Sequence, residues 1–198
     1  NNRFRTSQPR QAPERYQQYY QKSTEIKMRL FWKNKKAELK LDDISYEIQH
    51  FDNEKVKNVL TQIGIDSVDE FGRTALIWAC FAENMELINW LIENNADINP
   101  QDKEGYSALH FVAQEKKIKA TEYLLSKGSE TEVKDIHQNT PLWTAVFNAK
   151  DDLSIVELLL KNDANLDNIN LSKRTPREMA EKMLGEEYQK LKRKLNIE

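Results

Sequence analysis

The sequence predicts an all-α fold in which helix pairs, joined by short turns, stack into a solenoid. The main observation is a short motif, Thr or Ser followed by Ala or Pro, that begins at Thr74, Ser107, Thr140 and Thr175. The steps between these residues are 33, 33 and 35 residues. A period near 33 indicates that each unit is one supersecondary element that cannot bury its apolar face alone. Stacked units expose a long continuous surface, which favours binding over catalysis.

The unit that begins at Asp69 shows the two helices most clearly. Asp69 and Gly72 favour a turn, because Asp bonds its own backbone and Gly adopts left-handed conformations. Thr74 suits the N-cap of a first helix, and Asn84 interrupts the apolar pattern before a second one. The second helix is expected to end at Asn94–Asn95, since asparagine tolerates the left-handed conformation of a helix end.

The second helices supply the apolar spine between units. Leu91, Leu124 and Leu159 stand at equivalent positions of the three units and are expected to be deeply buried.

Both ends of such a solenoid need a covering helix pair, because a terminal unit would otherwise expose its apolar face. Over residues 37–68 the covering pair is predicted from the apolar residues Ile44, Ile48, Phe51, Val56, Val59, Leu60 and Ile63. Over residues 170–198 it is predicted from Met179, Ala180, Met183, Leu184, Tyr188, Leu191 and Leu195.

The recurring pattern resembles the ankyrin-repeat family. Residues 69–101, 102–134 and 135–169 resemble three clear repeats, and residues 37–68 and 170–198 resemble two cap-like repeats. The resemblance implies an ankyrin-repeat solenoid over the domain of residues 28–198, acting as a general protein-binding scaffold.

Five departures from the family pattern stand out. Ile77 and Trp143 replace the usual His, and Glu83 stands where Gly is expected between two helices. The third unit carries two extra residues near Lys150–Asp152, which predicts a longer turn. Lys173 replaces the Gly of the fourth unit.

The composition is that of a globular domain, with 39% apolar and 31% charged residues. A net charge of −2 predicts no nucleic-acid binding, and no apolar run approaches the roughly 20 residues of a membrane span. One cysteine, Cys80, makes no internal disulfide, so a cytoplasmic protein is expected. We expect a monomer when free, with another protein as its partner.

No residues form a catalytic or metal-binding pattern, so no catalytic residue, metal or cofactor is predicted. His50, His110 and His137 are scattered and lack a second ligand at metal-binding spacing. His110 occupies the His of the repeat motif, and the resemblance implies that it forms hydrogen bonds between neighbouring turns.

Residues 1–27 form a basic, Gln- and Tyr-rich N-terminal arm or linker. Five basic residues and one acidic residue give residues 1–24 a charge of +4, so the rest of the chain carries −6. Two interpretations stay open: a loose basic tail, or an arm that docks on the acidic solenoid or on a partner through Tyr16, Tyr19 and Tyr20.

In ankyrin arrays the turn tips and the inner helix faces form a concave groove, and we call the corresponding surface here the concave face. Large apolar residues occur there although the scaffold needs none, which is typical of binding hot spots. For Phe81 and Phe147 the alternative is packing on a neighbouring repeat. The predicted partner-binding residues are Phe71, Arg73, Phe81, Lys103, Tyr106, Ile136, His137, Phe147 and Asn148.

The predicted function is therefore non-enzymatic protein–protein interaction through the concave face. Two more specific roles stay open. The small array and the Lys-, Asn- and Ile-rich sequence resemble bacterial ankyrin proteins, some of which are immunity proteins that neutralise a toxin. The other role is a regulatory ankyrin domain of a larger multidomain protein, with residues 1–27 as the linker.

Overall fold

The computed structural model describes residues 40–197, so the predicted arm over residues 1–27 lies outside the described part. The elements of the N-terminal half are η1 (Leu41–Asp43), α2 (Ser45–Gln49), α3 (Asn53–Ile63), α4 (Ala75–Ala82) and α5 (Met85–Glu93). Those of the C-terminal half are α6 (Ala108–Glu115), α7 (Ile118–Ser126), α8 (Pro141–Asn148), α9 (Ser154–Lys161) and α10 (Pro176–Leu195).

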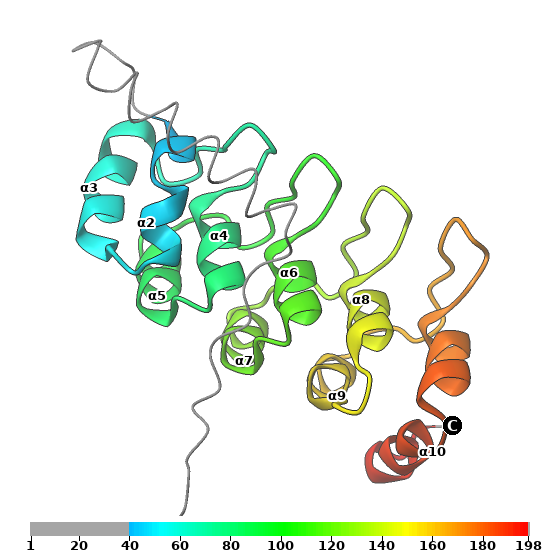
Figure 1. Cartoon of the computed structure of the whole chain (residues 1–198). Helices are drawn as coiled ribbons and strands as arrows, with labels where there is room; N and C mark the ends of the chain where they lie inside the picture. The colour runs from blue at the N-terminus through cyan, green and yellow to red at the C-terminus, as the bar shows by residue number, and fades with distance from the viewer. Residues whose placement is uncertain (1–39, 198) are drawn as a thin grey trace, which may run out of the picture. The chain divides into compact units, whose positions relative to one another are not determined.

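These helices stack in two layers (Figure 1). Helices α2, α4, α6, α8 and α10 pack on one another in sequence order, and α5, α7 and α9 form the second layer. Within residues 40–197 the only extended pairing consists of the isolated bridges Val68–Thr74 and Gln101–Ser107. The predicted all-α solenoid of helix pairs is confirmed.

The first helix of each unit begins at the hydroxyl residue predicted to cap it. Thr74 Oγ1 accepts a hydrogen bond from the Ile77 N–H at 3.3 Å, and Thr140 caps α8 in the same way. Thr175 and Glu178 form a reciprocal capping box at the start of α10. Each cap satisfies a backbone N–H that the helix itself leaves without a partner.

The turns between the paired helices explain two departures from the family pattern. The turn between α4 and α5 is Glu83–Asn84, and that between α6 and α7 is Lys116–Lys117. Glu83 and Lys116 both adopt left-handed backbone conformations, with φ of 54° and 55°, where a glycine would fit without strain. The turn between α8 and α9 is longer, Ala149–Leu153, as the extra residues of the third unit predict.

The core runs between the two helix layers. Leu91, Leu124 and Leu159 are completely buried, which confirms the predicted register of the units.

Most of the apolar residues from which the N-terminal cap is predicted are buried, and Ile63 is half-buried. Ile44, Ile48, Val56 and Leu60 of this helix pair are buried. The prediction for Phe51 is wrong: it lies in the turn between α2 and α3 with φ of 64°, and its side chain is exposed. A residue in that turn sits past the last turn of α2, so its side chain no longer follows the buried stripe of the helix.

The C-terminal cap consists of two helical segments, both within the range of α10. Gly185, with φ of 46° and ψ of −118°, breaks α10 into two helical segments. Ala180, Leu184, Tyr188 and Leu191 are buried, whereas Met183 is exposed, contrary to the prediction. In the repeat register, Met183 comes one residue after the position that is equivalent to Phe147, and Phe147 is exposed as well.

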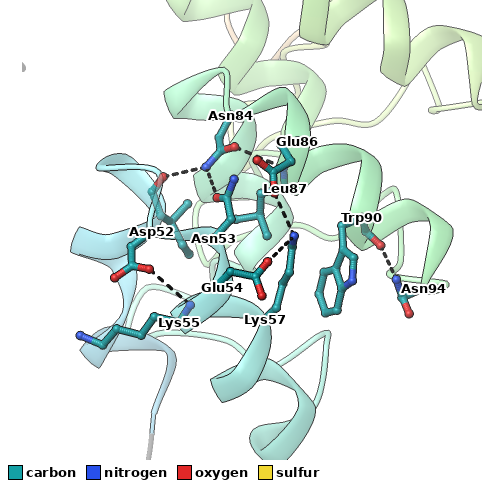
Figure 2. A network of polar contacts seen from close by, with 11 residues as sticks. Asp52, Asn53, Glu54, Lys55, Lys57, Asn84, Glu86, Leu87, Trp90 and Asn94 are labelled. Carbon is teal, nitrogen blue, oxygen red and sulfur yellow. Dashed lines mark hydrogen bonds and ion pairs between the residues drawn. The ribbon is translucent and has the colours of Figure 1, made fainter.

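Asn84, predicted only as an interruption between helices, joins the N-terminal cap to the first repeat. Its side-chain amide donates to the Ile48 carbonyl at 3.1 Å and to Asn53 Oδ1 at 2.7 Å (Figure 2). Its Oδ1 accepts the Leu87 N–H at 3.2 Å and thereby caps α5. One fully buried side chain therefore satisfies groups on three helices.

Gly105 lies where the loop of the second unit approaches the third most closely. Its φ is +78°, and a Cβ there would lie 2.8 Å from Asp135 Cα and 3.0 Å from the Ile136 nitrogen. Gly128 has a similar φ of +82°, but a Cβ there would meet nothing within 4 Å.

These two glycines give a matched pair of variants. Gly105→Ala is expected to lower the free energy of unfolding by at least about 1 kcal/mol more than Gly128→Ala, since both share the backbone strain and only the first displaces neighbouring backbone. Chemical denaturation of both variants measures the difference. Equal losses would show that the loops do not approach one another as described.

Candidate protein-binding face

The concave face is built on loops that repeat the same hydrogen bonds. In the loop before α4, Asp69 Oδ1 accepts the N–H groups of Phe71 and Arg73, each at 2.8 Å. Asp102, Asp135 and Asn170 make the equivalent pair of bonds in the next three loops. The loops therefore share one conformation, set by a buried side chain at the same position of each unit.

Backbone hydrogen bonds then join each loop to the next. The Lys103 N–H donates to the Phe71 carbonyl at 2.9 Å, and the Ile136 N–H donates to the Glu104 carbonyl at 3.0 Å. The Leu171 N–H donates to the His137 carbonyl at 3.0 Å. This ladder uses backbone groups only, so it places the loop-tip side chains in a row without requiring any particular residue type.

His110 ties the second unit to the third, as the resemblance implies. Its Nδ1 accepts the Ser107 N–H at 3.1 Å, which leaves Nε2–H to donate to the Asn139 carbonyl at 3.1 Å. Burial lowers the pKa of this histidine below its usual value, which keeps the ring neutral and Nδ1 able to accept. His110 therefore has a structural role.

In the first and second units, several predicted binding residues pack together in what we call the Arg73 cluster. The Arg73 guanidinium lies 5.1–5.2 Å from the ring centroids of Phe71, Trp78 and Phe111. Arg73 also forms an ion pair with the buried Asp102, with Nε and Oδ2 3.4 Å apart. Cation–π contacts and an ion pair together hold this guanidinium in one orientation.

Two further rings complete the cluster. Phe81 makes edge-to-face contacts with Trp78 and Phe111, and Tyr106 packs against Phe111 and His110. Phe81 and Tyr106 are accordingly only half-exposed. For Phe81 the structure thus supports the alternative of packing on a neighbouring repeat.

The third and fourth units present apolar side chains without such neighbours. Phe147 occupies the position equivalent to Phe81, yet it is 58% exposed. The reason lies in the surrounding register: Thr144 and Met179 take the places of Trp78 and Phe111, so no ring lies where Phe147 would pack. Among the described residues, Phe147 makes no ring contact.

Other large apolar side chains lie open on the same two units. Ile136 and Leu171 occupy equivalent loop tips and are 49% and 69% exposed. Met183 on α10 is also exposed. We call Ile136, Phe147, Leu171 and Met183 the apolar set.

Of the remaining predicted binding residues, two are exposed and one is hydrogen-bonded to its own helix. Lys103 and His137 are exposed at the loop tips. Asn148 is half-buried, and its side-chain amide donates to the Thr144 carbonyl at 2.8 Å. One of its hydrogen-bond donors is therefore used within α8.

The sequence analysis missed Trp78 and Phe111 as members of the Arg73 cluster. Both stand four residues after an N-cap, at the same position of the first helix in adjacent units. A signal existed, because two large aromatic residues recur at one position in adjacent units while the third unit has Thr144.

Three observations bear on other kinds of site. Over residues 40–197, no group of three or more His, Cys, Asp or Glu side chains is placed to hold a metal ion. No helix in this range is both long and apolar enough to cross a membrane. Cys80 is fully buried, and burial raises the pKa of its thiol, so the residue is poorly suited to act as a nucleophile.

Comparisons with known proteins agree with this architecture. A family model described as ankyrin repeats (3 copies) matches residues 45–135 and 94–171. An ankyrin repeat protein of variola virus is 30% identical over 58% of this chain, and human inversin is 32% identical over 39%. A putative ankyrin repeat protein of Rickettsia bellii is 35% identical over 53% of the chain.

In each case the matched region is a minor part of the relative. It covers 20% of the variola protein, 7% of human inversin and 31% of the Rickettsia protein. The family model, by contrast, matches more than half of this chain. The matched residues contain the stacked helix pairs and the loops that backbone hydrogen bonds join to one another. The chain belongs to the ankyrin-repeat family.

Proposed function

We propose that this chain is a non-enzymatic protein-binding module that holds a partner protein against its concave face. Ankyrin repeats are generally protein–protein interaction modules, and the family is generally non-enzymatic. The observation that carries the proposal is the exposure of large apolar side chains on consecutive units, above all Ile136, Phe147 and Leu171.

The stacking of the array does not require large apolar side chains at these positions. The loop ladder uses backbone groups, and the caps use hydroxyl and carboxylate groups, so neither needs Ile136 or Phe147. Removing a large apolar side chain from water contributes about 1.5–3 kcal/mol, which makes each of them a strong anchor once a partner covers it. Exposed apolar patches with polar surroundings commonly mark such interfaces.

The Arg73 cluster is a second reason to propose the concave face, and it lies on the first and second units. Phe71 is 37% exposed, while the contact with Arg73 holds its ring in place. A ring already held in place loses little conformational freedom on binding. We assign Phe71 a direct contact with the partner, and Tyr106, which packs against Phe111 and His110, a supporting contact.

We further propose a cytoplasmic protein that is monomeric without its partner. The more specific role depends on what it binds. A captured toxin would identify an immunity function, and a captured catalytic or receptor domain would identify a regulatory one.

The proposal is tested by capture followed by affinity measurement. The purified chain serves as bait in an extract of its source cells, mass spectrometry identifies the retained protein, and calorimetry measures its affinity. The Ile136→Ala/Phe147→Ala variant is expected to bind at least roughly 30-fold more weakly, or about 2 kcal/mol, because it removes two anchors.

The control for this comparison is Ile118→Ala on α7, which also truncates an exposed apolar side chain but lies in the other helix layer. It is expected to bind like the unaltered chain. Circular dichroism verifies that both variants fold. Unchanged affinity in a folded Ile136→Ala/Phe147→Ala variant would refute the concave face as the binding surface.

A further inference from the structure

We propose that the partner segment bound by the third and fourth units is acidic, with large apolar side chains among its carboxylates. This inference rests on the proposed function and adds the chemistry of the partner. It follows from three exposed cations on the fourth unit and from the hydrogen bonds and ion pairs that several nearby carboxylates make within the protein.

Three cations lie on the fourth unit beside the apolar set. Lys173 and Arg174 belong to the same loop as Leu171, and Lys182 occupies the position on α10 equivalent to Phe147 on α8. All three are exposed. None of them forms an ion pair with any other residue that the structure describes.

Several carboxylates of the third and fourth units are engaged within the protein itself. Asp135 is buried, with both oxygens bound within its own loop. Glu178 belongs to the capping box of α10. In the neighbouring second unit, Glu115 accepts a hydrogen bond from Gln114. Glu181, next to Lys182 on α10, is exposed, so the three cations exceed it in charge by two.

The cations therefore form a local positive surface on a chain whose net charge is −2. In the first and second units the balance differs: Arg73 is neutralised by the buried Asp102, and Glu70 and Glu104 are exposed at the loop tips. The concave face thus changes from mixed charge to cationic along the array. An elongated partner would place its acidic residues against the fourth unit.

An acidic segment with large apolar side chains matches both the apolar set and the three cations. Its apolar side chains cover Ile136, Phe147, Leu171 and Met183, and its carboxylates meet Lys173, Arg174 and Lys182. Arginine binds a carboxylate through two parallel hydrogen bonds, which makes Arg174 the most selective of the three cations. Since these cations are exposed, they act mainly on association rate and are screened by salt.

The experiment selects peptides from a display library with random 12-residue sequences, using the whole chain as bait. The selected sequences are expected to carry net negative charge and at least one large apolar residue. Their affinities are then measured by fluorescence anisotropy for two variants that change the net charge equally. Lys173→Glu/Arg174→Glu inverts two of the cations, and Lys119→Glu/Lys127→Glu inverts two exposed charges on or next to α7.

The first variant is expected to weaken binding of the selected peptides at least tenfold at low salt, and the second less than threefold. Neutral or basic selected sequences whose binding requires Phe147 would overturn the acidic partner while leaving the proposed function standing. Selected peptides that bind Ile136→Ala/Phe147→Ala as well as the unaltered chain would overturn both. Acidic peptides insensitive to Lys173→Glu/Arg174→Glu would also overturn the assignment of the cations.

Discussion

Leu124→Ala is expected to lower the free energy of unfolding by about 2–5 kcal/mol, since the side chain is completely buried and its truncation leaves a cavity. Leu124 lies on α7, which packs against α5, α6 and α9. In a stacked array each unit is stabilised only by its neighbours, so this loss is expected to weaken the adjacent units most.

Chemical denaturation measures the total loss, and hydrogen exchange shows where in the array it falls. Ile118→Ala on the same helix is the control, because Ile118 is exposed and its truncation should change stability by less than about 1 kcal/mol. A change of less than about 0.5 kcal/mol for Leu124→Ala would mean that the register of the units is wrong.

Asn84→Ala is expected to cost about 2–3 kcal/mol of unfolding free energy. The change removes the N-cap of α5 and leaves the buried Ile48 carbonyl without the amide that it accepts from. The damage is expected at the joint between the N-terminal cap and the first repeat, so α2 and α3 should exchange their amide hydrogens earlier than the rest of the domain.

Two variants separate the contributions. Asn84→Ser keeps an oxygen that caps α5 and loses the amide that reaches the cap, so it should retain part of the stability. Asn94→Ala is the control: Asn94 is exposed, and its amide donates only to the Trp90 carbonyl of its own helix, at 2.8 Å (Figure 2). Equal losses of unfolding free energy from Asn84→Ala and Asn94→Ala would contradict the role of Asn84 in joining the N-terminal cap to the first repeat.

The sequence predicts those features that depend on one unit alone. The N-caps at Thr74, Thr140 and Thr175 need only a hydroxyl residue before a helical pattern. The buried Leu91, Leu124 and Leu159 follow from helical spacing. These signals are local and repeat three or more times, so the fold and its register could be predicted from them.

The candidate binding surface is less predictable, because the exposure of its residues depends on residues of adjacent units. Phe81 and Phe147 occupy the same position, yet one packs and the other does not. The difference is set by Trp78 and Phe111 around the first and by Thr144 and Met179 around the second. The spacing rule assigns both phenylalanines to one class, and only the packing of neighbouring helices separates them.

Two further errors have the same origin. Phe51 and Met183 are among the apolar residues from which the two covering helix pairs are predicted, yet both are exposed. Phe51 lies in a turn with a left-handed backbone conformation, and the side chain of Met183 on α10 is exposed to solvent. Apolar character alone does not state which side of a helix faces a neighbour, particularly in cap units that depart from the repeat.

Hydrogen exchange of the chain with and without its captured partner tests the central claim most directly. The concave face predicts slowed exchange in residues 135–148 and 170–175, which contain the loop tips and the first helix that carry Ile136, Phe147 and Leu171. Exchange in α7 and α9 is expected to remain unchanged. Slowed exchange confined to α7 and α9, with none in the loops, would place the partner on the opposite layer and contradict the account.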